Sequence, residues 1–179
     1  MKYKALLSTP KIKDSFFHKT VILIVKEYNS SHMGLVLNKN IDESIKNFWS
    51  VAGYSTEISS RNNVKLGGPL FGSLMLLHKC RKYSDYQILE NTYLSVHVSS
   101  IENALRESRD KPYEMFVGYC AWAEMQLENE IKKGSWWSIE PNEYMIFGND
   151  ENMWEVYKYK QDVLYLEKLK LSKQNWIFN

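Results

Sequence analysis

The residue with the clearest capacity for covalent chemistry is Cys120, in the stretch GYCAWAEMQLENEI over residues 118–131. The apolar run before it is typical of a strand and the residues after it of a helix, and strand-to-helix corners carry the nucleophile in many enzymes. Such a corner needs small residues on both sides, as in G-x-S-x-G, but Trp122 stands where the second glycine would be. We therefore interpret Cys120 as a small buried residue packed at a corner.

The stretch GGPLFGSL carries the second candidate motif. Gly67 and Gly72 have the G-x-x-x-x-G spacing of a phosphate-binding P-loop. Ser73 stands where that loop requires lysine, and Pro69 removes a backbone donor that could face a phosphate. The pattern therefore favours a turn that joins two strands, with glycine for unusual φ and proline for rigidity.

The remaining titratable residues show no catalytic or metal-binding pattern. The histidines are His18, His32, His78 and His97. Their spacing matches no metal-ligand motif, and which of them approaches Cys120 in space stays open. We expect His78 and His97 to be hydrogen-bonded, partly buried residues of strands. Glu128 and Glu130 are two apart on an expected helix and should not face each other. The sequence thus indicates no catalytic residue, no metal site and no cofactor.

The sequence predicts that strands, several of them in hairpins, are interspersed with helices. Strands are expected at residues 3–9, 20–28, 33–39, 64–79 (two strands and a turn), 92–98 and 113–119. Helices are expected at residues 41–49, 99–108, 123–133 and 152–160, and residues 54–63 read as a loop. The run 20–28 is so apolar that both of its faces should be buried. Ser99 and Glu102 form a capping-box pattern. This mixture favours an α+β fold.

Length and composition bound the class of protein. A chain of 179 residues with 44% hydrophobic residues predicts one domain, 1–179, with a packed core. The longest apolar run, VILIV, is too short to span a membrane, and the lysine-rich start does not form a signal peptide. Two cysteines without a C-x-x-C are expected to stay reduced. We therefore expect a cytoplasmic protein.

Charge is distributed unevenly along the chain. Residues 1–19 contain five lysines against Asp14, and residues 158–173 contain five lysines against two acidic residues. The net charge is only +2, so the centre is acidic. Two basic ends could form one patch for an anionic partner, but lysines near chain ends are more simply solubilising.

The ordered set of motifs resembles the YqgE/AlgH family of small bacterial proteins. The resemblance is carried by LLSTPKIKDSFFHKTVILIV, MGLVLNK, LGGPL with a following LLH, VSSIENAL, and GYCAWAEMQLENEI with a following WW. It spans roughly residues 5–157 in order and leaves residues 160–179 beyond the pattern. No single motif is very specific, but the ordered set is.

The resemblance implies an α+β fold with a partly closed, branched, mostly antiparallel sheet flanked by helices. It implies no established enzyme activity, and one branch of the family is labelled a transcriptional regulator of exopolysaccharide production. The residues that match the family pattern are Gly34, Leu35, Asn38, Gly67, Gly68, Pro69, His78, Gly118, Tyr119, Trp122, Gln126, Leu127, Glu128 and Trp136. Candidate ligand-binding residues among them are Asn38, Gly67, Gly68, Pro69, Trp122 and Gln126.

Departures from the family pattern concentrate after Cys120. Ala121, Ala123 and Met125 stand where the family usually has glycine. An L-residue at positive φ costs roughly 1–2 kcal/mol, whereas Ala and Met are good helix formers. We therefore expect negative φ at all three and a helix from about 121–123 to about Lys133. Trp122 should then lie in its first turn.

Three functions remain open. The leading expectation is a regulatory protein that acts by binding an unknown protein or small molecule, without a membrane role. The alternative is a small-molecule- or nucleotide-binding enzyme with a site near Gly67–Pro69, Trp122 and Gln126. The third is nucleic-acid binding through the basic ends, but the chain lacks a recognition-helix motif. We therefore do not expect sequence-specific DNA binding by the isolated chain. Residues 160–179 carry enough apolar surface that we expect them to lie on the core.

Overall fold

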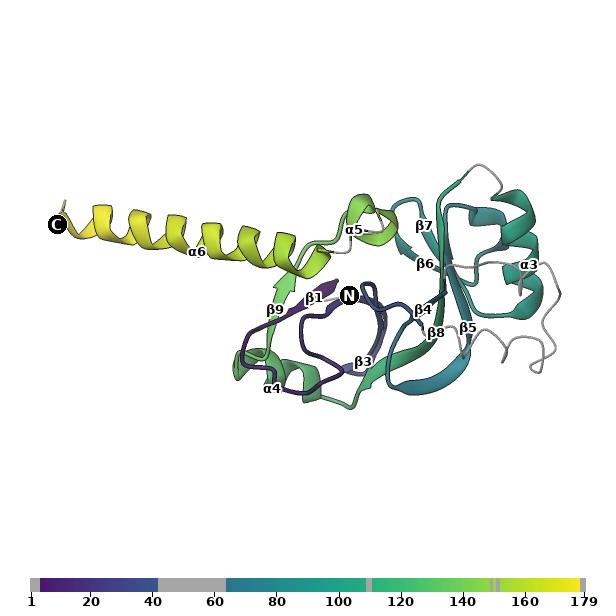
Figure 1. Cartoon of the computed structure of the whole chain (residues 1–179), viewed down its shortest axis with the longest axis horizontal. Coiled ribbons are helices and arrows are strands. Elements are labelled where there is room, and N and C mark those ends of the chain that lie inside the picture. Colours follow the sequence, from purple (N-terminus) through teal and green to yellow (C-terminus); the bar gives the residue numbers. More distant parts are fainter. Residues whose placement is uncertain (1–3, 42–63, 109–110, 149, 151, 178–179) are drawn as a thin grey trace.

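A computed structural model describes residues 4–41, 64–108, 111–148, 150 and 152–177, and in these residues nine strands form one curled sheet (Figure 1). The strands are β1 (Ala5–Ser8), β2 (Val21–Tyr28), β3 (Ser31–Val36), β4 (Val64–Leu66), β5 (Leu70–His78), β6 (Tyr86–Leu89), β7 (Thr92–Ser95), β8 (Tyr113–Trp122) and β9 (Trp136–Ile139). The helices are η2 (Arg81–Tyr83), α3 (Val98–Glu107), α4 (Gln126–Lys132), α5 (Glu143–Phe147) and α6 (Met153–Ile177).

The long strand β8 is the branch point of the sheet. The strand order is β6-β7-β5-β8-β3-β2-β1-β9, and β4 joins off this path by pairing with β8. The first half of β8 lies between β5 and β4, whereas its last residues pair with β3, for example Gly34 with Cys120. Among the strand pairs of the described residues, β4–β8 alone is parallel. The expected α+β fold with a branched, mostly antiparallel sheet flanked by helices is confirmed.

Strand β2 shows how apolar periodicity builds the two faces of this sheet. Val21, Leu23 and Val25 join one buried cluster, while Ile22 and Ile24 join another on the opposite face. All five are at most 5% exposed, so the expectation that both faces of this run are buried is confirmed. The turn to β3 consists of two residues with positive φ, Asn29 and Ser30, as expected of a tight hairpin.

Three apolar clusters hold the helices on the sheet. Helix α3 packs through Ile101, Ala104 and Leu105 on β4, β5 and β8. Helix α4 contributes Leu127 to a cluster with β1, β2, β3 and β8. Helix α5 and the first turns of α6 cover the third cluster, to which α6 supplies Met153, Trp154 and Tyr157.

Most expected elements are present, but the C-terminal segment lies differently. Apart from Ile41, the expected helix 41–49 falls outside the described residues, as does the expected loop 54–63. The short elements η2, β6, β9 and α5 were not anticipated. Residues 153–177 form one helix that projects away from the sheet (Figure 1). Tyr165 and Leu166 are 64% and 55% exposed, so the expectation that residues 160–179 lie on the core is wrong for the described side chains of this segment. No helix in the described part is both long and apolar enough to cross a membrane.

Candidate functional site

Cys120 lies inside β8 and not at a corner. It pairs with Gly34 of β3, is 1% exposed, and its Sγ is 3.6 Å from the carbonyl oxygen of Gly67. Burial raises the pKa of this thiol to about 12. The expected burial of Cys120 is confirmed, and a thiol that is neutral at pH 7 is a poor nucleophile.

The backbone after Cys120 differs from the expectation in one instructive way. Strand β8 continues to Trp122 because β3 pairs with residues 120–122, and this pairing overrides the helix propensity of the alanines. Helix α4 therefore begins only at Gln126. Met125 has a φ of 60°, so the expectation of negative φ at all three positions is wrong there, although Ala121 and Ala123 keep negative φ. The left-handed residue turns the chain from strand to helix, and its N–H donates to the carbonyl of Ser30.

The Gly67–Pro69 turn is built for close contact with β8. The N–H of Gly67 donates to the carbonyl of Val117. A Cβ on Gly68 would lie 2.0 Å from the backbone carbon of Tyr119, which no side chain tolerates. Gly118 has a φ of 73° and would place a Cβ 2.6 Å from the carbonyl oxygen of Gly68. These glycines are therefore explained by one backbone crossing, without a bound phosphate.

The side chain of Asn38, which follows β3, forms hydrogen bonds with the backbone at the start of β2. Its Oδ1 accepts the N–H of Val21 at 2.9 Å, and its Nδ2 donates to the carbonyl of Lys19 at 2.8 Å. Lys19 has a φ of 53°, so this amide stabilises an unusual backbone conformation. The side chain of Asn38 is thus used within the fold.

Trp122 and Gln126, in contrast, converge on one carboxylate, that of Glu130. The indole N–H groups of Trp122 and Trp136 donate to Glu130 Oε2 at 3.0 and 2.7 Å. Gln126 Nε2 donates to Glu130 Oε1 at 2.9 Å. The four-residue spacing of 126 and 130 is the local signal for this contact, but the prediction made for Glu130 concerned only Glu128.

This carboxylate borders a groove of about 450 Å³, which we call the tryptophan groove. Its apolar walls are Ile12, Phe17, Trp122 and Trp136. Its charged residues are Lys13, Asp14, Glu130 and Lys133. The rings meet edge to face, with Trp136 centred 6.1 Å from Trp122 and 5.7 Å from Phe17. Of the six candidate ligand-binding residues, the groove contains Trp122 and Gln126, whereas Asn38 and the Gly67–Pro69 turn lie outside its lining.

Two local devices fix the loop that forms one wall of the groove. Asp14 Oδ1 accepts the N–H groups of Phe16 and Phe17, both at 2.9 Å, which sets the turn that presents Phe17. Thr9 Oγ1 donates to the carbonyl of Gly134 at 2.7 Å and ties the loop to the end of α4. Helix α4 ends at Lys132, close to the expected limit at Lys133, and Gly134 follows with a φ of 76°. The groove walls are therefore held by the fold before any ligand binds.

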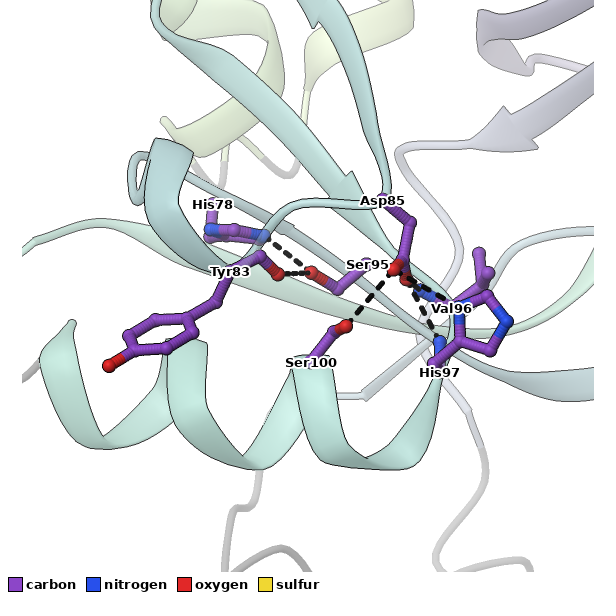
Figure 2. Close-up of polar contacts among 7 residues, drawn as sticks. All are labelled: His78, Tyr83, Asp85, Ser95, Val96, His97 and Ser100. Atoms are coloured by element: carbon purple, nitrogen blue, oxygen red, sulfur yellow. Dashed lines mark hydrogen bonds and ion pairs between the residues drawn. The ribbon is translucent and has the colours of Figure 1, made fainter.

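A buried histidine–serine pair lies elsewhere, between β5 and β7 (Figure 2). The N–H of Cys80 donates to His78 Nδ1 at 3.1 Å, so the hydrogen of a neutral ring belongs on Nε2. Nε2 is 2.8 Å from Ser95 Oγ, which in turn donates to the carbonyl of Tyr83 at 2.7 Å. Burial lowers the pKa of His78 to about 4, and Asp85 opposes that shift. Neither ring nitrogen of His78 is therefore free to take the proton of Ser95, so the pair is not arranged for base catalysis. The expected hydrogen bonding of His78 is confirmed, and its burial is complete instead of partial.

Asp85 lies beside this pair and holds the segment that leads into helix α3 (Figure 2). Its carboxylate accepts the N–H groups of Val96 and His97 and the hydroxyl of Ser100. His97 Nδ1 lies 3.0 Å from Asp85 Oδ1, but the His97 side chain is 72% exposed and His97 is the N-cap of α3. The expectation of a partly buried strand histidine is therefore wrong for His97. Burial alone would raise the pKa of Asp85, but these hydrogen bonds outweigh it and hold the pKa at about 2. No cluster of metal-ligating side chains occurs in the residues that the structure describes.

The protein is thus a small α+β protein built on one curled, branched sheet, with the tryptophan groove beside strand β8. A family model described as AlgH-like matches residues 5–165, and the chain belongs to this family. The match reaches eight residues beyond the expected limit of 157. The expected family membership is confirmed.

Individual bacterial proteins are also similar to this chain in sequence. A UPF0301 protein of Chlamydia caviae is 29% identical over 159 residues, covering 86% of this chain and 82% of that protein. A UPF0301 protein of Bacteroides thetaiotaomicron is 28% identical, covering 97% and 85%.

Two solved structures share the fold. The solution structure of the AlgH protein from Pseudomonas aeruginosa has a TM-score of 0.62 at 22% identity, covering 82% of this chain and 80% of that one. A crystal structure of a Corynebacterium diphtheriae protein gives 0.64 at 18% identity, covering 84% and 81%.

Proposed function

We propose that this AlgH-like protein acts by binding a zwitterionic, apolar amino acid or a closely similar molecule in the tryptophan groove. The observation that carries the proposal is the contact set of Glu130. Its carboxylate accepts hydrogen bonds from two indoles and one amide, all neutral donors, so these contacts leave its negative charge available to an ammonium group. Aromatic rings next to a carboxylate are a favourable environment for such a cation.

The other lining residues suit the remaining parts of this ligand. Phe17 and Ile12 offer apolar surface for a side chain, and the exposed Lys13 and Lys133 offer ammonium groups to a carboxylate. The volume of about 450 Å³ lies within the usual range for sites that bind small molecules, about 300–1,000 Å³. The proposed role is regulatory, exerted in the cytoplasm through ligand occupancy and not through a chemical step.

A set of three matched ligands tests this proposal by calorimetric titration. L-phenylalanine carries both charges, L-phenylalaninamide only the cation, and N-acetyl-L-phenylalanine only the anion. We expect L-phenylalanine to bind best. Glu130→Gln should weaken the binding of the two ligands that carry an ammonium group, L-phenylalanine and L-phenylalaninamide, at least tenfold, or by about 1.4 kcal/mol. Glu124→Gln, an exposed carboxylate before α4, is the control and should change nothing. Equal binding of all three ligands, or of none, would contradict the proposal.

The enzyme alternative near Gly67–Pro69 gains no support, because the backbone of this turn is hydrogen-bonded to, and packed against, the sheet.

A direct nucleic-acid role is disfavoured because lysines near both chain ends form ion pairs within the protein. Lys4 pairs with Glu140, Lys19 with Glu155, and Lys158 with Asp162. A regulatory effect on transcription would therefore act through a ligand or another protein. Nanomolar, site-specific DNA binding by the isolated chain at physiological salt is the result that would refute this view.

A further inference from the structure

The curled sheet leaves a seam between two hairpins that do not pair with each other. The strand order separates β2 and β3 from β6 and β7 by β5 and β8. Nevertheless a pocket of about 220 Å³ is lined from both sides, by Val25, Lys26 and Met33 on one and by Tyr86, Leu94 and Val96 on the other. We call it the seam pocket. It therefore lies where the sheet curls together without closing by hydrogen bonds.

A β-bulge orients the first side of this pocket. Ile24 pairs with Gly34 and Lys26 with Met33, so Val25 is an extra residue on β2. Consecutive residues of a strand normally point to opposite faces, but a bulge re-aims one of them. Val25 and Lys26 therefore both line the pocket. Strand β6 carries a second register shift, between Gln87 and Leu89, just after Tyr86.

The lining of the seam pocket is mostly apolar, with one cationic side chain at its rim. Val25, Met33, Leu94 and Val96 supply apolar surface, and Val25 and Leu94 belong to the main core cluster. Among the described residues that line the pocket, only Lys26 is charged, and its Nζ lies 5.4 Å from the centre of the Tyr86 ring. A cation held over an exposed ring, at the rim of an apolar pocket, can exchange that weak contact for an anion.

The size of the pocket limits the ligand. An apolar cavity of about 150 Å³ accommodates benzene. By proportion, 220 Å³ accommodates roughly nine heavy atoms. A phosphorylated sugar or a nucleotide is too large and too polar for such a lining, whereas a short-chain or small-ring monocarboxylic acid fits both its size and its charge.

We propose that the seam pocket binds a small apolar monocarboxylic acid, with the hydrocarbon part against Val25, Met33 and Leu94 and the carboxylate at Lys26. The site is independent of the tryptophan groove. Trp122 and Trp136 of the groove belong to the cluster on the opposite face of β2, so either site can bind its ligand without the other.

Hexanoate and hexanamide make the test, because they have the same number of heavy atoms and differ in charge. Isotope-labelled protein is titrated with each, and methyl and amide signals are followed by NMR. We expect saturable shifts for hexanoate at Val25, Met33, Leu94 and Val96. Lys26→Met should weaken hexanoate at least tenfold and leave hexanamide unchanged. Lys39→Met is the matched control, because Lys39 also lies over a ring, that of Phe16, outside this pocket.

A filling substitution gives the second arm. Met33→Trp should abolish binding of both ligands while circular dichroism shows a folded chain, and the L-phenylalanine response of the groove should persist. The proposal is overturned if hexanoate shifts map elsewhere or do not saturate. It is equally overturned if Lys26→Met weakens hexanamide as much as hexanoate. If Met33→Trp does not fold, the Lys26 comparison decides alone.

Discussion

His78 Nε2 lies 2.8 Å from Ser95 Oγ, and this contact stabilises the fold instead of preparing a nucleophile. The serine proton is directed to the Tyr83 carbonyl, and His78 Nδ1 accepts from the Cys80 backbone. A histidine and a serine at hydrogen-bonding distance are therefore insufficient evidence for catalysis, because the direction of each proton decides their role.

This arrangement predicts a pH-dependent stability. The pKa of His78 is about 4 in the folded protein and 6.5 in its ordinary state, so the unfolded chain binds an additional proton between these values. The stability from neutral His78 is present above pH 6.5 and is lost as the pH falls towards 4, by up to about 3 kcal/mol. Urea unfolding between pH 4 and 7 measures it. His78→Gln should flatten the slope, whereas His18→Gln, at an exposed histidine, should retain it.

The contacts of Asp85 at the start of α3 give a second prediction. Asp85→Ala should lower the free energy of unfolding by about 2–3 kcal/mol, because two backbone N–H groups and Ser100 lose their acceptor. Ser99→Ala should change it by less than about 0.5 kcal/mol, because Ser99 is exposed and His97 is the N-cap. A larger effect at Ser99 would restore the capping box that the sequence indicated.

The strand β2 and the contacts of Asp85 show what the sequence could and could not predict. Burial of both faces of β2 follows from a local apolar run, and it was predicted. Asp85 lies twelve residues before His97, whose N–H it accepts, and no local pattern indicates such a partner. Likewise, the pairing of β3 with Trp122 decided where β8 ends, although the alanines favour helix. Of the groove, sequence reasoning named Trp122 and Gln126 but not the carboxylate that joins them.

Met125 is a residue whose substitution should stabilise the protein. Its φ of 60° is costly for an L-residue and free for glycine. Because its side chain is 45% exposed, little burial is lost on removal. Met125→Gly should raise the free energy of unfolding by about 0.5–1 kcal/mol. Ala123→Gly, at negative φ, should lower it, and the opposite order in thermal unfolding would contradict the strain.

Cys120 should resist thiol reagents in the folded protein. With a pKa of about 12, its thiolate fraction at pH 8 is on the order of one in ten thousand, and the side chain is 1% exposed. In a Cys80→Ser background, folded protein should react far more slowly than protein unfolded in urea. Equal rates in the two states would show an accessible thiol.

The projecting end of α6 should be dispensable for stability, whereas its first turns should not. Trp154 is 7% exposed and its indole N–H donates to the carbonyl of Ser8, and Met153 and Tyr157 join the same cluster. From Tyr159 onward the described apolar side chains are largely exposed, so they add little to the folded state. A chain ending at Lys160 should therefore unfold in urea within about 1 kcal/mol of the full chain, since an isolated helix end is marginal on its own. Trp154→Ala should instead cost about 3–5 kcal/mol, because it leaves a cavity and an unpaired carbonyl. If the shortened chain loses several kcal/mol while Trp154→Ala loses little, the stabilising contacts of α6 lie in its distal half.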